Sequence, residues 1–216
     1  MGTVGRMTAS YARAERAALA DSLLAAGPDA PTLCEGWATR DLAAHIVLRE
    51  RRPDAAAGIL IKPLAGHAKR VQDDLAAGDY PALVDKVRNP QPLSLVRIDA
   101  VEEAMNLVEF YIHHEDVRRA KPGWTARDLP AGYAHALHGR VKMTARLAAR
   151  RFPGTIVVQA PGEEPFQVGA GGDRVEVSAP PGELALFFSG RQRAAEVALS
   201  GDEGLVKRLR DARLGL

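Results

Sequence analysis

The chain has 216 residues, of which 46% are hydrophobic and 26% are charged, values typical of a folded globular protein. Its net charge of +2 at pH 7 is spread along the chain without a long basic run, so neither nucleic acid nor a membrane surface is indicated as a partner. No segment approaches the ~20 consecutive apolar residues of a membrane span, and the first residues carry charges throughout, which predicts a cytoplasmic protein without a secretory signal. The single cysteine, Cys34, excludes an internal disulfide and a cysteine-rich zinc site, so histidines and carboxylates are the candidate metal ligands.

The first 150 residues are predicted to be almost entirely helical. Apolar residues recur at helical spacing, and glycine and proline separate the segments. Helices are expected over 6–26, from about Thr39 onward, over 54–62, 64–77 and 81–88, from Asp99 to the Pro122-Gly123 pair, and over 130–151.

The pattern changes after "RRFPG". Short runs rich in β-branched residues, bounded by glycine and proline, predict strands over 155–160, 165–170, 174–179 and 195–201. Helical patterns follow in "GELALFFSG" and "DEGLVKRLRDARLG". The change predicts an α+β protein with two domains, a helical bundle at 1–152 and a small α/β domain at 153–216.

The segment "NLVEFYIHHEDVRRA" brings carboxylates and two histidines into an otherwise apolar helix. Each residue advances about 100° around a helix, so Glu109 and His113 are about 40° apart and one turn apart on the same face. His114 lies about 140° from Glu109 and belongs elsewhere. The pair borders apolar residues, which makes it a candidate for metal binding; a weak surface ion pair is the alternative.

A metal site needs a further ligand, and the residues alone leave several candidates open. His45 lies among apolar residues of the second helix and is either a ligand or a hydrogen-bonded core histidine. His135 and His138, three residues apart, form a competing pair, whereas His67 has no obvious partner.

Two sequence motifs carry a resemblance to a known family. "TLCEGWATRDLAAHI" contains the run C-x-G-W-x-x-x-D-L-x-x-H, and "VEFYIHHEDVRRA" contains E-x-x-x-H-x-x-D-V. With them the chain resembles the mycothiol-dependent maleylpyruvate isomerase family, a branch of the DinB-like metal-binding helical bundles. The tail "PPGELALFFSGRQRAAEVALSGDEGLVKRL" is similar to the small sterol-carrier-like C-terminal domain of that family.

The resemblance implies an antiparallel DinB-like bundle in which His45, Glu109 and His113 bind a divalent metal, zinc being the first candidate. It implies a thiol-using enzyme, either an isomerase or an S-transferase, with mycothiol as co-substrate and a small-molecule electrophile as substrate. Arg191 is the candidate catalytic residue, as an anion anchor that reaches the metal; a solvated arginine at a helix end is the alternative. The rival function is a non-catalytic metal- or small-molecule-binding module.

Three residues near the proposed ligands have two interpretations each. Asp41 and Asp116 lie about one turn from His45 and His113 and either orient their rings or are solvated surface carboxylates. Cys34 is either a reactive thiol or, as is usual for a lone cysteine in an apolar loop, a small buried residue. It approaches the metal only if its loop folds back, and the resemblance implies that the reacting thiol is external.

Overall fold

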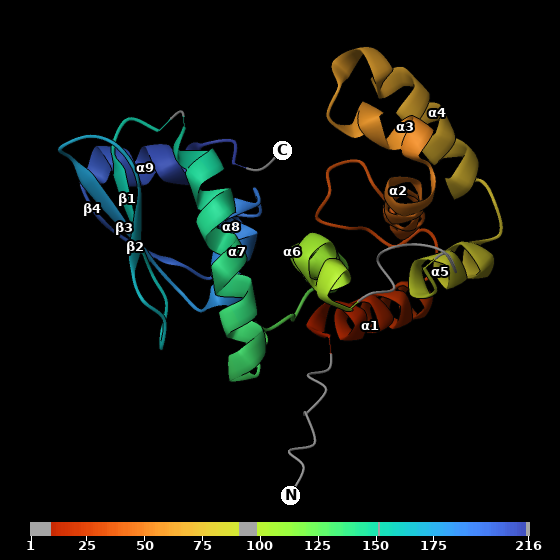
Figure 1. Cartoon of the computed structure of the whole chain (residues 1–216), viewed down its shortest axis with the longest axis horizontal. Coiled ribbons are helices and arrows are strands. Elements are labelled where there is room, and N and C mark those ends of the chain that lie inside the picture. The colour runs from red at the N-terminus through yellow and green to blue at the C-terminus, as the bar shows by residue number, and fades with distance from the viewer. Residues whose placement is uncertain (1–9, 91–98, 151, 215–216) are drawn as a thin grey trace, which may run out of the picture. The chain divides into compact units, whose positions relative to one another are not determined.

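The computed structural model describes residues 10–90, 99–150 and 152–214 (Figure 1). The chain forms two compact units, Met1–Trp124 and Thr125–Leu216, and each is described by itself. The expected helical residues 6–9, 151 and 215 lie outside the described ranges.

The first unit is helical, as the sequence predicts. Its helices are α1 (Tyr11–Ala26), α2 (Thr39–Arg51), α3 (Pro53–Ala56), α4 (Ala65–Ala76), α5 (Tyr80–Arg88) and α6 (Asp99–Arg118), with 3₁₀ turns η1 (Ala57–Ile59) and η2 (Lys62–Leu64). The expected helix over 54–62 is instead the short α3 followed by two 3₁₀ turns. Pro63 cannot donate a backbone hydrogen bond, and Gly58 allows the chain to pass close to Leu64 and Ala68.

Helix α1 packs along α6, and this contact fixes the helix that carries Glu109 and His113. The start of α1 is held by Glu103 of α6, whose Oε2 accepts hydrogen bonds from Ser10 Oγ at 3.0 Å and from Ala12 N–H at 2.9 Å. Apolar side chains fill the bundle, among them Leu19, Leu23, Leu42, Ile46, Leu107 and Phe110, all fully or almost fully buried.

A buried arginine joins four helices of this unit. The guanidinium of Arg16 on α1 pairs with Glu50 of α2 at 2.6 Å and donates to the carbonyl of Val87 on α5 at 2.8 Å. The same guanidinium lies 4.4 Å from the ring centroid of Phe110 on α6. A buried charge is costly unless paired, and here the pairing partners come from neighbouring helices, so the interaction also sets their arrangement.

The second unit contains a mixed four-stranded sheet in the order β2-β1-β3-β4. Its elements are α7 (Ala131–Ala149), β1 (Thr155–Gln159), β2 (Phe166–Gly169), β3 (Arg174–Ser178), α8 (Pro181–Phe188), β4 (Ala198–Gly201) and α9 (Glu203–Asp211). Strand β1 pairs antiparallel with β2 and parallel with β3, and β3 pairs antiparallel with β4. All four predicted strands are present, and the α+β class is confirmed.

Helix α7 belongs to the second unit, whereas the predicted domain boundary lies after it, between residues 152 and 153. It packs against α8 and β2 (Figure 1). Every residue of α8 is buried, so this helix needs cover on all sides. The amphipathic pattern of α7 shows that it packs on something, but not on which partner.

Among the described residues, no helix is long and apolar enough to cross a membrane.

Candidate metal centre

The side chains of His45, Glu109 and His113 converge in the first unit. Glu109 Oε1 lies 3.2 Å from His113 Nε2 and 3.5 Å from His45 Nε2. The donor atoms of the three residues all lie within 4.8 Å of one another. Ligands at zinc distances in tetrahedral geometry are separated by about 3.3–3.5 Å. The group therefore has dimensions that suit one ion, although their role as ligands stays a prediction.

Two helices position this group. Glu109 and His113 lie one turn apart on α6, as the 100° step predicts, and His45 reaches them from α2. The rings of His45 and His113 meet edge to face, with centroids 5.4 Å apart. The side chains of His113, His45 and Glu109 are 9%, 12% and 29% exposed, so the group is open to solvent on the Glu109 side.

Asp116 contacts the other ring nitrogen of His113. Its Oδ2 lies 2.9 Å from His113 Nδ1, and the carboxylate is fully buried. A carboxylate at Nδ1 holds a proton there, so that when His113 gives up its second ring proton the lone pair forms on Nε2, on the side of Glu109. Of the two candidate orienting carboxylates, Asp116 thus contacts a proposed ligand. Asp41 accepts a hydrogen bond from the backbone N–H of Ala38 at 2.9 Å, which makes it a cap of α2.

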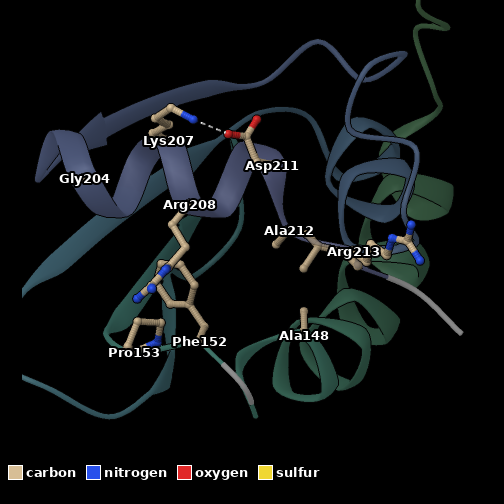
Figure 2. A pocket seen from close by; sticks show the side chains of 10 residues that line it. Ala148, Phe152, Pro153, Gly204, Lys207, Arg208, Asp211, Ala212 and Arg213 are labelled. Carbon is tan, nitrogen blue, oxygen red and sulfur yellow. Dashed lines mark hydrogen bonds and ion pairs between the residues drawn. The ribbon is translucent and has the colours of Figure 1, made fainter.

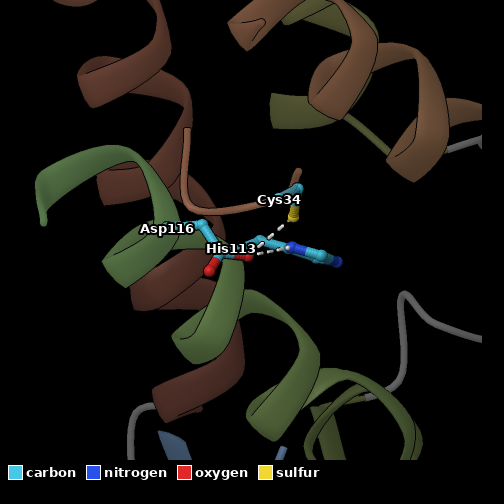
Figure 3. A group of neighbouring side chains, drawn as sticks. All are labelled: Cys34, His113 and Asp116. Carbon is cyan, nitrogen blue, oxygen red and sulfur yellow. Dashed lines mark hydrogen bonds and ion pairs between the residues drawn. The ribbon is translucent and has the colours of Figure 1, made fainter. Parts of the chain in front are cut away.

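Cys34 lies beside the site because its loop folds back onto α6. The backbone N–H of Leu33 donates to the carbonyl of Asp116 at 3.1 Å, and Cys34 Sγ donates to Asp116 Oδ2 at 3.2 Å (Figure 3). Thr32 Oγ1 donates to the carbonyl of Trp37 at 2.8 Å and so closes the loop on itself. The spacing of Cys34 and His45 in the sequence gave no indication of this contact.

Two further side chains border the group. The ring of Trp37 lies 5.1 Å from that of His45 and covers part of it. Arg49 Nε lies 3.6 Å from Glu109 Oε1, and its Nη1 donates to Asn106 Oδ1 at 3.0 Å. Arg49 follows His45 by four residues on α2, so helical spacing could have identified it as a neighbour of the site.

The three side chains differ in their protonation. Burial lowers the pKa of His45 below its ordinary value of 6.5. Burial alone would raise the pKa of Glu109, but hydrogen bonds from His113 and His45 and the charge of Arg49 lower it far below the usual range. Burial would likewise lower the pKa of His113, but hydrogen bonds with Asp116, Cys34 and Glu109 raise it well above 6.5. Without a metal, Glu109 is therefore anionic, His113 cationic and His45 neutral near pH 7.

His114 faces away from this group. Its Nδ1 lies 2.6 Å from Glu15 Oε1 and its Nε2 lies 2.8 Å from Ser22 Oγ, both on α1. The predicted separation of His113 and His114 on the helix is therefore realised by two different sets of partners.

The competing histidines have other partners. His135 lies 3.0 Å from Glu163, and His138 Nε2 lies 3.3 Å from the carbonyl of Glu164. His67 lies 3.2 Å from the exposed carboxylate of Asp54. Among the described residues, none of these three histidines joins a group of three donors that could hold a metal.

Arg191 belongs to the second unit, where its Nη1 donates to the carbonyl of Ser189 at 2.7 Å just after α8. Its role as an anion anchor stays a prediction.

A groove of about 730 Å³ lies elsewhere in the second unit (Figure 2). Its wall includes Phe152 and Pro153 together with Lys207, Arg208 and Asp211 of α9. Lys207 and Asp211 pair with each other at 2.6 Å. None of the predicted site residues lines this groove, so the candidate chemistry remains at α2 and α6.

No protein-family model matches the sequence, and no curated protein matches it. Among solved structures, a histidine-to-alanine mutant of the mycothiol-dependent maleylpyruvate isomerase is similar, with a TM-score of 0.54 at 16% identity, covering 88% of this chain and 90% of that chain. A second structure of the mycothiol-dependent maleylpyruvate isomerase has a TM-score of 0.48 at 17% identity over the same shares. The first comparison shows that the chain has the fold of this isomerase.

Proposed function

We propose that the protein is a divalent-metal-dependent, thiol-using enzyme, either an isomerase or an S-transferase. Its co-substrate is a low-molecular-weight thiol, mycothiol, and its substrate is a small electrophile. The convergence of His45, Glu109 and His113 at a partly open position carries the proposal. The fold, shared with a mycothiol-dependent isomerase, supports it.

The donor set fits a catalytic metal. Two imidazoles and one carboxylate are typical of zinc sites that keep an open coordination position, whereas structural sites use four protein ligands. The same donors accept several divalent ions, so zinc is the first candidate and not a necessity. The exposed edge of Glu109 marks the side from which a small molecule reaches the group.

A divalent ion at this position would lower the pKa of a coordinated thiol, which is near 8.5 in water, and supply a thiolate at neutral pH. Asp116 holds the Nδ1 proton of His113 and so keeps Nε2 available. Trp37 shields part of the His45 ring from water. Cys34 lies on the Nδ1 side of His113, away from Glu109 and His45, so the reacting thiol comes from outside the chain.

The two versions of the reaction share their first step. The sulfur adds to a conjugated double bond, which becomes a single bond. In the isomerase this bond rotates and the thiol leaves, so the double bond re-forms with the other geometry. In the S-transferase the adduct is the product. Arg191 is proposed to anchor an anionic group of the substrate.

The test begins with metal analysis of protein purified without added metal, followed by a titration with mycothiol. Turnover of maleylpyruvate and of a model electrophile is then measured with and without mycothiol. Wild type should turn over only with the thiol, and His45→Ala should lose turnover together with the metal held by the group of His45, Glu109 and His113. His67→Ala is the matched control, because this histidine pairs with Asp54 outside the group, and it should retain both.

If no thiol supports turnover or binds the metal-loaded protein, the enzyme proposal fails. A metal-loaded protein that binds no thiol would instead be the non-catalytic binding module.

A further inference from the structure

Different side chains with metal-binding atoms face the two ring nitrogens of His113. Its Nε2 faces Glu109 and His45, and its Nδ1 faces Asp116 and Cys34. We propose that Cys34, Asp116 and Nδ1 of His113 form a second metal-binding site, which is occupied as an alternative to the first. This goes beyond the proposed function, which uses only the Nε2 side.

The geometry of the second group is as compact as that of the first. Asp116 Oδ2 lies 2.9 Å from His113 Nδ1 and 3.2 Å from Cys34 Sγ, and the donor atoms of all three residues lie within 4.8 Å of one another. Figure 3 shows the Cys34 thiol and the His113 imidazole next to each other, with dashed lines from both converging on the Asp116 carboxylate. A metal would replace the protons that now bridge the three donor atoms. A small increase in the distances between these atoms is enough to accommodate the ion.

The surroundings supply both rigidity and access. Asp116 is fully buried and His113 is 7% exposed, so two of the donors are held in place by the packing of α6. Cys34 is half-buried on the loop, which gives an ion a path from solvent. The loop is attached to α6 by the hydrogen bond from Leu33 N–H to the Asp116 carbonyl, so the thiol stays next to the carboxylate.

The chemistry of this site differs from that of the first. A thiolate ligand favours softer ions such as Zn²⁺, Cd²⁺ and Co²⁺, whereas the first group contains only nitrogen and oxygen donors. Binding releases the proton of the Cys34 thiol and the proton of Nδ1 to solvent. The proton on Nε2 remains and is donated to Glu109. The two negative charges of Cys34 and Asp116 then balance the charge of a divalent ion.

The two sites exclude each other through His113. A neutral imidazole has one nitrogen with a free lone pair, while the other carries hydrogen. An ion on Nε2 leaves Nδ1–H donating to Asp116, and an ion on Nδ1 leaves Nε2–H donating to Glu109. The chain is therefore expected to bind one ion at a time across both sites.

The test is a titration of the metal-free protein with Co²⁺, without any added thiol, followed by absorption spectroscopy. Thiolate bonded to Co²⁺ gives an intense near-ultraviolet charge-transfer band that imidazole and carboxylate ligands do not give. His45→Ala and Glu109→Ala remove donors of the first site only. Both should bind one Co²⁺ per chain and show the band. In the double variants that add Cys34→Ser, the band should disappear.

Circular dichroism establishes that each variant is folded, and the two first-site variants serve as independent tests. If the folded variants bind no Co²⁺, or bind it without the thiolate band, the second site does not exist. The outcome is independent of the proposed function, because the band is measured without electrophile or mycothiol. A failure of thiol-dependent turnover in wild type would therefore not count against the second metal-binding site.

Discussion

Two adjacent histidines of α6 illustrate how one residue step changes the chemistry of a side chain. His113 points toward Glu109 and Asp116, whereas His114 points toward Glu15 and Ser22 of α1. Both are buried, so burial alone does not distinguish a ligand from a structural histidine. Their partners do: of the two histidines, His113 alone belongs to a group of three donors close enough together to hold an ion.

Substitution of the two residues should therefore have different effects. His113→Ala should abolish most metal binding, whereas His114→Ala should leave the metal content nearly unchanged. His114→Ala should instead lower the free energy of unfolding by about 1–3 kcal/mol, since the buried Glu15 carboxylate loses a hydrogen-bond partner. Metal analysis and urea unfolding measure the two effects. Equal metal loss in both variants would show that the wrong histidine had been assigned.

The protonation of the site predicts how metal binding depends on pH. The pKa of His113 is raised, so this ring is protonated at pH 7, while the lowered pKa of His45 and of Glu109 leaves these groups already deprotonated. An ion bound by the three should release about one proton at pH 7. Calorimetry in buffers of different ionisation enthalpy measures this number. Zero protons released would contradict the assignment of His113 as a cation in the metal-free protein.

The same pKa shifts predict how the stability of the metal-free protein changes with pH. The raised pKa of His113 contributes stability that is fully present below about pH 6.5 and is lost as the pH rises through its folded-state pKa. The lowered pKa of Glu109 contributes stability that is present above about pH 4.5 and is lost as the pH falls. The combined stabilisation by His113 and Glu109 should thus be greatest between these limits, while the lowered pKa of His45 acts in the opposite sense below about pH 6.5. Thermal unfolding of metal-free protein across pH measures the sum. A maximum at alkaline pH would contradict this.

At the scale of elements, the connection between α2 and α4 depends on one glycine. A Cβ on Gly58 would collide with the carbonyl oxygen of Leu64 and would lie 2.7 Å from Ala68 Cβ, so the 3₁₀ turns could not keep their present path. Gly66, on the first turn of α4, has nothing within 4 Å of the corresponding position. The two glycines are therefore a matched pair.

Gly58→Ala should lower the free energy of unfolding by about 1–3 kcal/mol, because backbone atoms have to move apart. Gly66→Ala should raise it by about 0.4–1 kcal/mol, since alanine reduces the freedom of the unfolded chain. Urea unfolding of both variants measures the difference. A neutral Gly58→Ala would show that the turn can rearrange.

At the scale of the whole molecule, the domain to which α7 belongs decides between two boundaries, one after residue 124 and one after residue 152. The fully buried α8 packs against α7, which argues that the fragment 125–216 folds cooperatively and that the fragment 153–216, which lacks α7, does not. Fragment 1–124 contains His45, Glu109 and His113 and should bind one divalent ion. Circular dichroism, thermal unfolding and metal analysis of the three fragments test this. Cooperative folding of 153–216 would support the boundary predicted after residue 152.

Arg191 and the three proposed metal ligands belong to different units, so their contributions can be separated. Arg191→Ala should lower kcat/KM by 10-fold or more, about 1.4 kcal/mol, if it anchors the substrate, and should leave the metal content unchanged. Arg193→Ala is a control in the same segment. Equal activity of the two variants would place Arg191 among the solvated arginines.

The sequence by itself determined what depends on local spacing. The shared face of Glu109 and His113 follows from the pitch of one helix, and the strands at 155–160 and 174–179 follow from β-branched runs between turn residues. The positions of glycines and prolines predicted most helix ends to within a few residues. These features need no knowledge of distant parts of the chain.

Only the tertiary structure decided which distant residues meet. The loop that returns Cys34 to Asp116, 82 residues further along the chain, is held by the hydrogen bonds of Leu33 N–H and Cys34 Sγ to Asp116 and by the packing around them. The contact of Arg49 with Glu109 and the grouping of α7 with the sheet have the same origin. A periodic pattern shows that a face is buried but not against what, because the partner is chosen by the free energy of packing the whole chain.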